Sequence, residues 1–112
     1  MKFKKISDYR GSLYVSEVPD NFTIRRVFWI EAPKGVTRGQ HGHFKNNIFM
    51  ILQMGKVKVN MIDQKGINSL VDLADVSSSI FIPSNVWHSI DFVEDSLLLC
   101  LNSHSYDSKD YF

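Results

Sequence analysis

The stretch Lys56-Val57-Lys58-Val59-Asn60-Met61 alternates polar and apolar side chains at every step. Successive side chains of a β-strand point to opposite faces, so this period of two predicts a strand with one wet face and one buried face. No part of the sequence shows sustained helical periodicity with capping residues at its ends. We therefore expect β-strands to build the core.

On both sides of this stretch, short runs rich in Val, Ile, Phe, Tyr and Leu recur with turn-forming residues between them. The separators include Pro33-Lys34-Gly35, Gly55 and Pro83-Ser84-Asn85, which suit turns or tolerate positive φ angles. Many short, regularly spaced strands are typical of a β-sandwich or barrel. The expected strands are 11–18, 26–32, 47–54, 56–63, 67–73, 79–82 and 96–103.

Length and composition narrow the function classes. The 112 residues are enough for one hydrophobic core and too few for two, so we expect a single domain over residues 1–112. A formal net charge of +1 gives no global attraction to nucleic acid or to an anionic membrane surface. No run approaches the roughly 20 apolar residues that span a bilayer. Cys100 is the single cysteine and lies in an apolar run, which excludes an internal disulfide and predicts a buried thiol. These features favour a cytoplasmic protein.

Three histidines mark the expected functional pocket. In Thr37-Arg38-Gly39-Gln40-His41-Gly42-His43, two of them are two residues apart, so on an extended strand both imidazoles point to the same face. His88 ends the stretch Ile82-Pro83-Ser84-Asn85-Val86-Trp87-His88, where a turn leads into another strand. Imidazole binds metals and also transfers protons near neutral pH, so both kinds of site are open at this point.

The order of these motifs, HxH, a glycine after a strand and then PxxxxH, resembles the two sequence motifs of the cupin superfamily. The first motif runs from Gly35 to Gly55, and the second covers Pro83, Asn85 and His88. The resemblance implies an all-β, cupin-type jelly-roll barrel of two antiparallel sheets.

Metal-binding cupins usually add a glutamate after HxH, and Ile48 stands in that register here. An aliphatic side chain cannot ligate a metal. Three neutral imidazoles, those of His41, His43 and His88, could still hold an ion such as zinc. A further alternative is that the three histidines only line a core.

A narrower resemblance covers nearly the whole chain. The sequence resembles the sugar nucleotide 3,4-ketoisomerases, which are WxcM-like or FdtA-like cupins. This resemblance implies isomerisation of dTDP-4-keto-6-deoxyglucose without a metal or other cofactor: a proton leaves C3, an enediol forms and a proton returns at C4. The matching stretches are 8–13, 26–30, 35–43 and 82–88, with Tyr106-Asp107 and Asp110-Tyr111 near the end.

The same resemblance implies the site residues and the assembly. His41 and His43 would be the catalytic acid–base pair, and which of them removes the proton is open. The expected substrate-binding residues are Arg38, His88, Trp29, Arg10 and Lys45. Family members also resemble intertwined dimers, so we expect a homodimer with an exchanged N-terminal strand, which could carry Arg10 to a neighbouring subunit.

Two departures from the family pattern support another interpretation. Phe28 and Trp29 stand where family members commonly have a tyrosine pair, and Ile48 stands where they have a glutamine. Both changes remove hydrogen-bonding groups that could stabilise an enediolate. The alternative is therefore a protein that binds the sugar nucleotide but has lost turnover.

Overall fold

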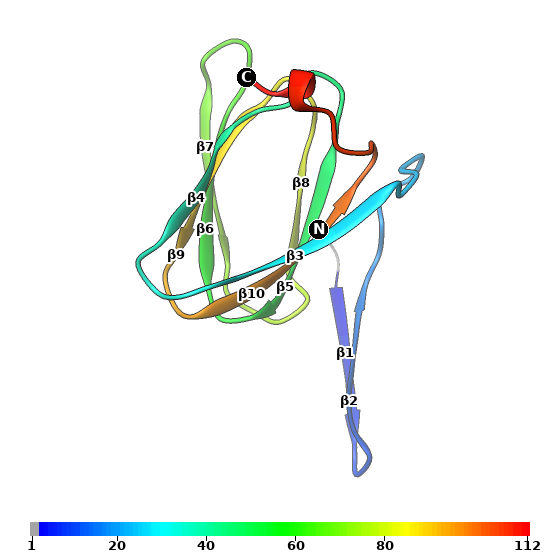
Figure 1. Ribbon diagram of the computed structural model, residues 1–112. Helices are drawn as coiled ribbons and strands as arrows, with labels where there is room; N and C mark the ends of the chain where they lie inside the picture. The colour runs from blue at the N-terminus through cyan, green and yellow to red at the C-terminus, as the bar shows by residue number, and fades with distance from the viewer. Residues whose placement is uncertain (1–2) are drawn as a thin grey trace.

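The computed structural model of this protein describes residues 3–112 and consists almost entirely of β-strands (Figure 1). A single turn of 3-10 helix, Ser108–Asp110, follows the last strand. Within residues 3–112, no helix is long and apolar enough to cross a membrane. The strands are β1 (Phe3–Asp8), β2 (Gly11–Ser16), β3 (Arg26–Ala32), β4 (Thr37–His41), β5 (Ile48–Met54), β6 (Val57–Ile62), β7 (Asn68–Leu73), β8 (Ser79–Ile82), β9 (Trp87–Phe92) and β10 (Ser96–Asn102).

Strands β3 to β10 form two antiparallel sheets that enclose the core. One sheet has the order β3-β10-β5-β8 and the other has the order β4-β9-β6-β7. Most neighbours within a sheet are distant in sequence because the chain passes repeatedly from one sheet to the other, as in a jelly roll. The predicted all-β fold of two antiparallel sheets is confirmed.

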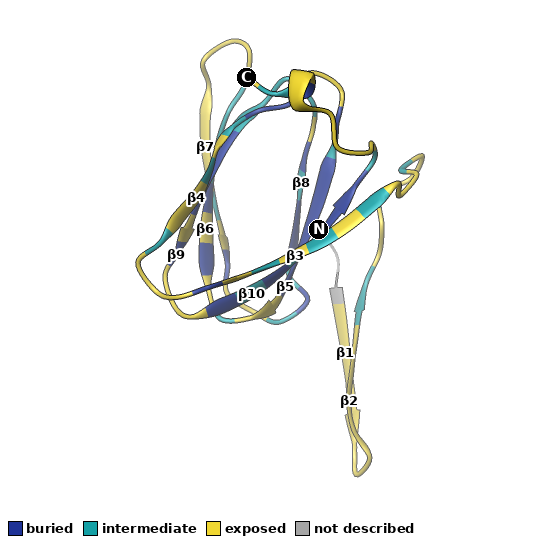
Figure 2. Ribbon diagram, viewed as in Figure 1, coloured by how far each residue is buried: buried dark blue, intermediate teal, exposed yellow. Residues whose placement is uncertain are grey.

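The core lies between the sheets, where their inward side chains meet. Figure 2 marks the buried residues of both sheets in dark blue. In β6, Val57 and Val59 are buried while Lys58 is exposed, as the alternating stretch predicted. Leu98 and Cys100 enter the same core from β10. The prediction of a buried thiol is confirmed, and desolvation raises the pKa of Cys100 to about 12.

A second cluster of buried side chains lies outside this core. Phe49, Ile51 and Leu101 form it, and Phe22, from the segment between β2 and β3, packs against it. Because side chains alternate along a strand, these residues occupy the outer face of the β3-β10-β5-β8 sheet.

Strand β1 was not among the expected strands. Lys4 and Lys5 interrupt the apolar pattern there, but the chain pairs with β2 residue by residue, from Phe3 opposite Ser16 to Asp8 opposite Gly11. The β1–β2 hairpin stands away from the barrel, and most of it is exposed (Figures 1 and 2). At its base, the Ser16 hydroxyl donates a 2.8 Å hydrogen bond to the carbonyl of Ser77.

Candidate active site

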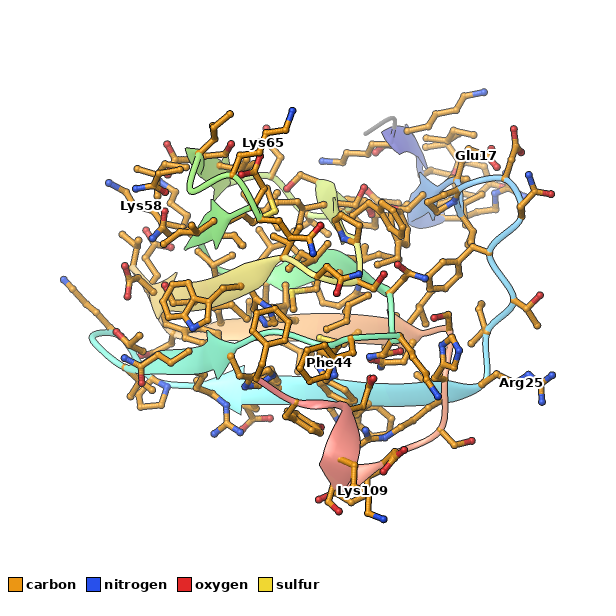
Figure 3. All side chains as sticks on the ribbon, turned by 90° about the horizontal axis from the view of Figure 1, so that it is seen from above. Glu17, Arg25, Phe44, Lys58, Lys65 and Lys109 are labelled. Carbon is orange, nitrogen blue, oxygen red and sulfur yellow. The ribbon has the colours of Figure 1, made fainter. Side chains whose placement is uncertain are left out.

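A cavity of about 400 Å³ opens between the two sheets. The C-terminal segment, residues 103–112, crosses the barrel at this end. Figure 3 looks onto that end, where Phe44 marks the chain after β4 and Lys109 marks the crossing segment. The cavity is lined by Arg26, Phe28, Trp29, Ile30, Glu31, Arg38, Gly39, His41, His43, Ile48, Met50, His88, Ile90, Asn102 and Tyr111.

A β-bulge in β4 brings Arg38 and His41 to the same wall of this cavity. Both residues lie opposite inward-facing residues of β9, and Gln40 is the extra residue between them. Gly39 and Gln40 have φ angles of 83° and 61°, the left-handed conformation that such bulges use. In a regular strand, which has no bulge, side chains three positions apart point to opposite faces. The bulge therefore explains how both residues reach the cavity.

The structure brings the three predicted histidines together. The ring centroid of His41 lies 5.1 Å from that of His43 and 5.0 Å from that of His88, in edge-to-face contacts. His43 and His88 are buried, and His41 is half-buried. The Nδ1 atom of His41 lies 3.0 Å from the carbonyl oxygen of Gly39. Because a carbonyl oxygen only accepts, this bond assigns the proton to Nδ1 and leaves Nε2 free to accept a proton.

Burial keeps these imidazoles uncharged at neutral pH. Desolvation is the largest cause that lowers the pKa of His41 and of His43. For His88, desolvation, with repulsion from His41 and His43, lowers the pKa to about 3. A neutral imidazole can take up a proton as a base, so the wall is suited to proton transfer.

The C-terminal segment supplies two residues whose place the sequence did not reveal. The ring centroid of Tyr111 lies 4.4 Å from that of His43 and 5.0 Å from that of His41. The carboxylate of Asp110 is buried, and its Oδ2 lies 3.3 Å from His43 Nδ1. The pair Asp110-Tyr111 belongs to the family resemblance, but no pattern in the linear sequence places it beside His43.

Arg26 is a second guanidinium at the cavity, in addition to Arg38. Its guanidinium carbon lies 5.1 Å from the ring centroid of Phe28 and 5.3 Å from that of Tyr106. Stacking of a guanidinium on aromatic rings restricts the position of its charge. The sequence signal was weak, because Arg26 was noted only within an expected strand and within the stretch 26–30 that matches the family, without a role of its own.

Three of the expected binding residues lie away from the histidine wall. Trp29 borders the cavity, but it is 67% exposed, and strand alternation directs its indole to the outer face, beside Leu99. Arg10 lies at the tip of the hairpin and is ion-paired within it. Lys45 is not one of the cavity-lining residues; its backbone N–H donates to Asp110. Within residues 3–112 of one chain, the cavity is therefore lined by neither Arg10 nor Lys45.

The arrangement does not fit a three-histidine metal centre. Ile48 lines the cavity in the register where metal cupins carry a carboxylate. The Asp110 carboxylate already accepts the backbone N–H groups of Lys45 and Asn46. Among residues 3–112, no group of three or more His, Cys, Asp or Glu side chains is arranged to hold a metal ion. We therefore derive no metal-dependent step.

Similarity to known proteins extends over the whole chain. The family model described as WxcM-like, C-terminal (FdtA) matches residues 1–112. The chain is 35% identical over 115 residues to the TDP-4-oxo-6-deoxy-alpha-D-glucose-3,4-oxoisomerase of Aneurinibacillus thermoaerophilus, and the match covers 99% of this chain and 82% of that protein.

Solved structures show the same likeness. QdtA, a sugar 3,4-ketoisomerase from Thermoanaerobacterium thermosaccharolyticum in complex with TDP, superimposes with a TM-score of 0.86 at 33% identity. A mutant of QdtA in complex with TDP-4-keto-6-deoxyglucose gives a TM-score of 0.85 at 35% identity. Each comparison covers 99% of this chain and 83% of the other.

Proposed function

Because the chain belongs to the WxcM-like, C-terminal family, we propose that it is a sugar nucleotide 3,4-ketoisomerase acting on dTDP-4-keto-6-deoxyglucose. The observation that carries this proposal is the pair of neutral imidazoles, His41 and His43, on one wall of a cavity. The relatives support the substrate class, since one is named for this TDP sugar and another was solved with it bound.

The isomerisation requires two proton transfers at carbon. A base removes the C3 proton, which is acidic because the C4 ketone is adjacent, and O4 gains a proton to give the 3,4-enediol. A proton then returns to C4 while O3 loses its proton, which leaves the ketone at C3. Protons lost and gained balance, so this route needs no cofactor. His41 and His43 are the pair that shuttles them.

Cationic and neutral groups around the pair bind the substrate. Arg38 donates charge-assisted hydrogen bonds to the diphosphate or to the developing enediolate. Arg26, stacked between two aromatic rings, adds a second positive charge at the same cavity. His88 stays neutral and orients the sugar by hydrogen bonding.

A second candidate function is a protein that binds the sugar nucleotide without turnover. Phe28 and Ile48 favour it, because both line the cavity at positions where family members carry polar groups. A wall without these donors stabilises an enediolate less well.

The proposal includes a homodimer in which the β1–β2 hairpins are exchanged. Ile6, Leu13 and Tyr14 of the hairpin are exposed although they are apolar, and pairing between copies would cover them. Arg10, at the hairpin tip, would then be available to the cavity of the other copy. We also propose a cytoplasmic location, which the free, buried thiol of Cys100 supports.

Proton NMR of dTDP-4-keto-6-deoxyglucose with the protein in deuterated water tests the activity. We expect a 3-keto product with deuterium at C4, and we expect His43→Asn to abolish it. Saturable binding without exchange or product would overturn the isomerase proposal and favour the binding function.

A further inference from the structure

Asn102 places a buried amide in the wall of the cavity. It is the last residue of β10, it is 1% exposed, and it lines the cavity. Its side chain lies on the inward face of the strand, because Cys100 and Leu98, two and four positions earlier, belong to the core between the sheets. Burying an amide is costly unless its hydrogen bonds are made. The place of Asn102 therefore calls for a physical explanation.

Asn102 lies in a row of three cavity-lining side chains that crosses the sheet. It pairs with Arg26 on β3 and with Ile48 on β5. Directly paired residues of neighbouring antiparallel strands point to the same face, with their Cβ atoms about 5 Å apart. Ile48 stands where family members carry a glutamine. The row thus still holds an amide, but it comes from the neighbouring strand.

A chain of hydrogen bonds orients this amide. The backbone N–H of His104 donates to Oδ1 of Asn46 at 3.1 Å, so the other end of the Asn46 amide is its NH2 group. That group donates to Oδ1 of Asn102 at 2.9 Å. Nδ2 of Asn102 carries two hydrogens, and its one acceptor among residues 3–112 is the carbonyl of Cys100, at 3.3 Å. A second N–H of a fixed amide is therefore free for a bound ligand.

This amide lies at the histidine end of the cavity. Asn46, whose side chain donates to Asn102, also donates its backbone N–H to the carboxylate of Asp110 at 3.1 Å. The same carboxylate lies 3.3 Å from Nδ1 of His43. Because the proposed proton transfers take place at His41 and His43, the reacting carbons of the sugar bind at this end. The free N–H of Asn102 is thus near the reacting atoms.

We propose that Asn102 is a substrate-binding residue whose free N–H donates to O4 of the sugar, the ketone oxygen that gains negative charge as the C3 proton leaves. It supplies from β10 the amide that Ile48 does not supply from β5. The inference rests on the proposed function, and it removes one of the two reasons for a protein that binds the sugar nucleotide without turnover.

Asn102→Ala tests the contact in the whole protein. We expect kcat to fall about tenfold to a hundredfold with KM changed by less than about threefold, because a donor to a developing oxyanion acts mainly in the transition state. Asn47→Ala is the matched control. Its amide is also hydrogen-bonded, to Ser103 and to the backbone N–H of Ser84, but it does not line the cavity, so kcat should stay within about twofold.

A second substitution separates this contact from a structural role. Ile48→Gln in the Asn102→Ala protein returns an amide to the same row from β5, and we expect it to raise kcat again by about tenfold. Ile48→Met in the same background has a side chain of similar length without a donor, and it should restore nothing. A kcat of Asn102→Ala within about twofold of the unsubstituted protein, or equal recovery with glutamine and methionine, would overturn the assignment.

A binding measurement on the unsubstituted protein keeps this inference separate from the proposed activity. The side-chain ¹H–¹⁵N signals of Asn102 should shift when dTDP-4-keto-6-deoxyglucose saturates the protein, and they should shift much less with TDP, which lacks the sugar. Such a shift in a protein that yields no 3-keto product would leave the contact standing and overturn the proposed function. Signals that do not move on saturation with the sugar nucleotide, or that move equally with TDP, would overturn the contact, whatever the activity.

Discussion

A single hydroxyl group separates Phe28 from the tyrosine that family members commonly carry at this position. Phe28 faces the cavity, and its ring lies against the guanidinium of Arg26. A phenol there would place an O–H donor at the wall on which the enediolate develops. Donors preorganised for a developing oxyanion are among the strongest contributors to catalysis.

Phe28→Tyr is therefore expected to raise kcat about tenfold or more, which corresponds to about 1.4 kcal/mol of transition-state stabilisation. Steady-state turnover of dTDP-4-keto-6-deoxyglucose measures the change. Val27→Tyr is the matched control, because Val27 is exposed on the outer face of the same strand and does not line the cavity, so its substitution should leave kcat unchanged. A gain with Val27→Tyr and none with Phe28→Tyr would contradict the assignment of the two faces.

At the residue scale, the sequence predicted the histidines better than their surroundings. His41 and His43 follow from their spacing, and Arg38 and His88 follow from the motifs. Trp29 borders the cavity, but its indole is mostly exposed and its neighbour Phe28 takes the inward position. A shift of the strand by one residue exchanges which of two neighbouring side chains points inward. The sequence RVFWI is apolar on both faces, so it does not decide between the two arrangements.

At the scale of elements, β4 with the two residues after it, β9 and the C-terminal segment together form the wall that carries the three histidines. The backbone N–H and carbonyl of Gly42 are hydrogen-bonded to the carbonyl and N–H of Phe112. The sequence could not reveal this pairing, because it joins an irregular stretch to the end of a strand. Strand β1 escaped prediction for a related reason, because its pairing with the expected strand β2, and not its own apolar pattern, makes it a strand.

Gly42 is required for space beside Phe112. A Cβ atom on Gly42 would lie 2.2 Å from the ring of Phe112, so the ring would have to move. Gly42→Ala is expected to lower the free energy of unfolding by about 1 kcal/mol, because the half-exposed ring of Phe112 must turn away from the added methyl group.

A double-mutant cycle with urea unfolding measures this effect. In a Phe112→Ala background the added methyl meets no ring, so Gly42→Ala should then cost less than about 0.5 kcal/mol. Equal costs in both backgrounds would show that the clash is not the cause.

At the scale of the whole molecule, the jelly roll itself was predictable. Alternation in β6 fixed one buried face, and the order of the two histidine motifs indicated how the strands are arranged. The long-range pairing that follows brings three imidazoles together, and the burial of His43 and His88 links the site to the stability of the fold.

Acid should therefore destabilise the protein through His88. Its pKa is about 3 in the folded protein and near 6.5 when unfolded. Below pH 6.5 the unfolded chain binds a proton that the folded chain excludes, so stability falls as the pH falls from 6.5 toward 3. One such group contributes a slope of about 1.4 kcal/mol per pH unit. Urea unfolding between pH 6 and pH 4 should show a shallower slope for His88→Gln, while His104→Gln, on the surface, should retain the original slope.

The exposed hairpin gives a prediction about assembly. Sedimentation equilibrium should find a dimer, and Ile6→Lys with Leu13→Lys should shift it to monomer, because these two residues lie opposite each other on one apolar face. Ser7→Lys with Ser12→Lys is the control, since this pair lies on the other face of the hairpin. A monomer before any substitution would refute the proposed exchange.

The bulge in β4 also has a genetic consequence. Gln40 is exposed, and its side chain belongs to neither the core nor the cavity wall. An in-frame deletion of its codon would leave Arg38 and His41 two residues apart on a regular strand, so both side chains would still point to the same face and we expect the allele to retain function. Missense alleles that place asparagine or glycine at this codon would be tolerated, since both residues readily adopt a positive φ.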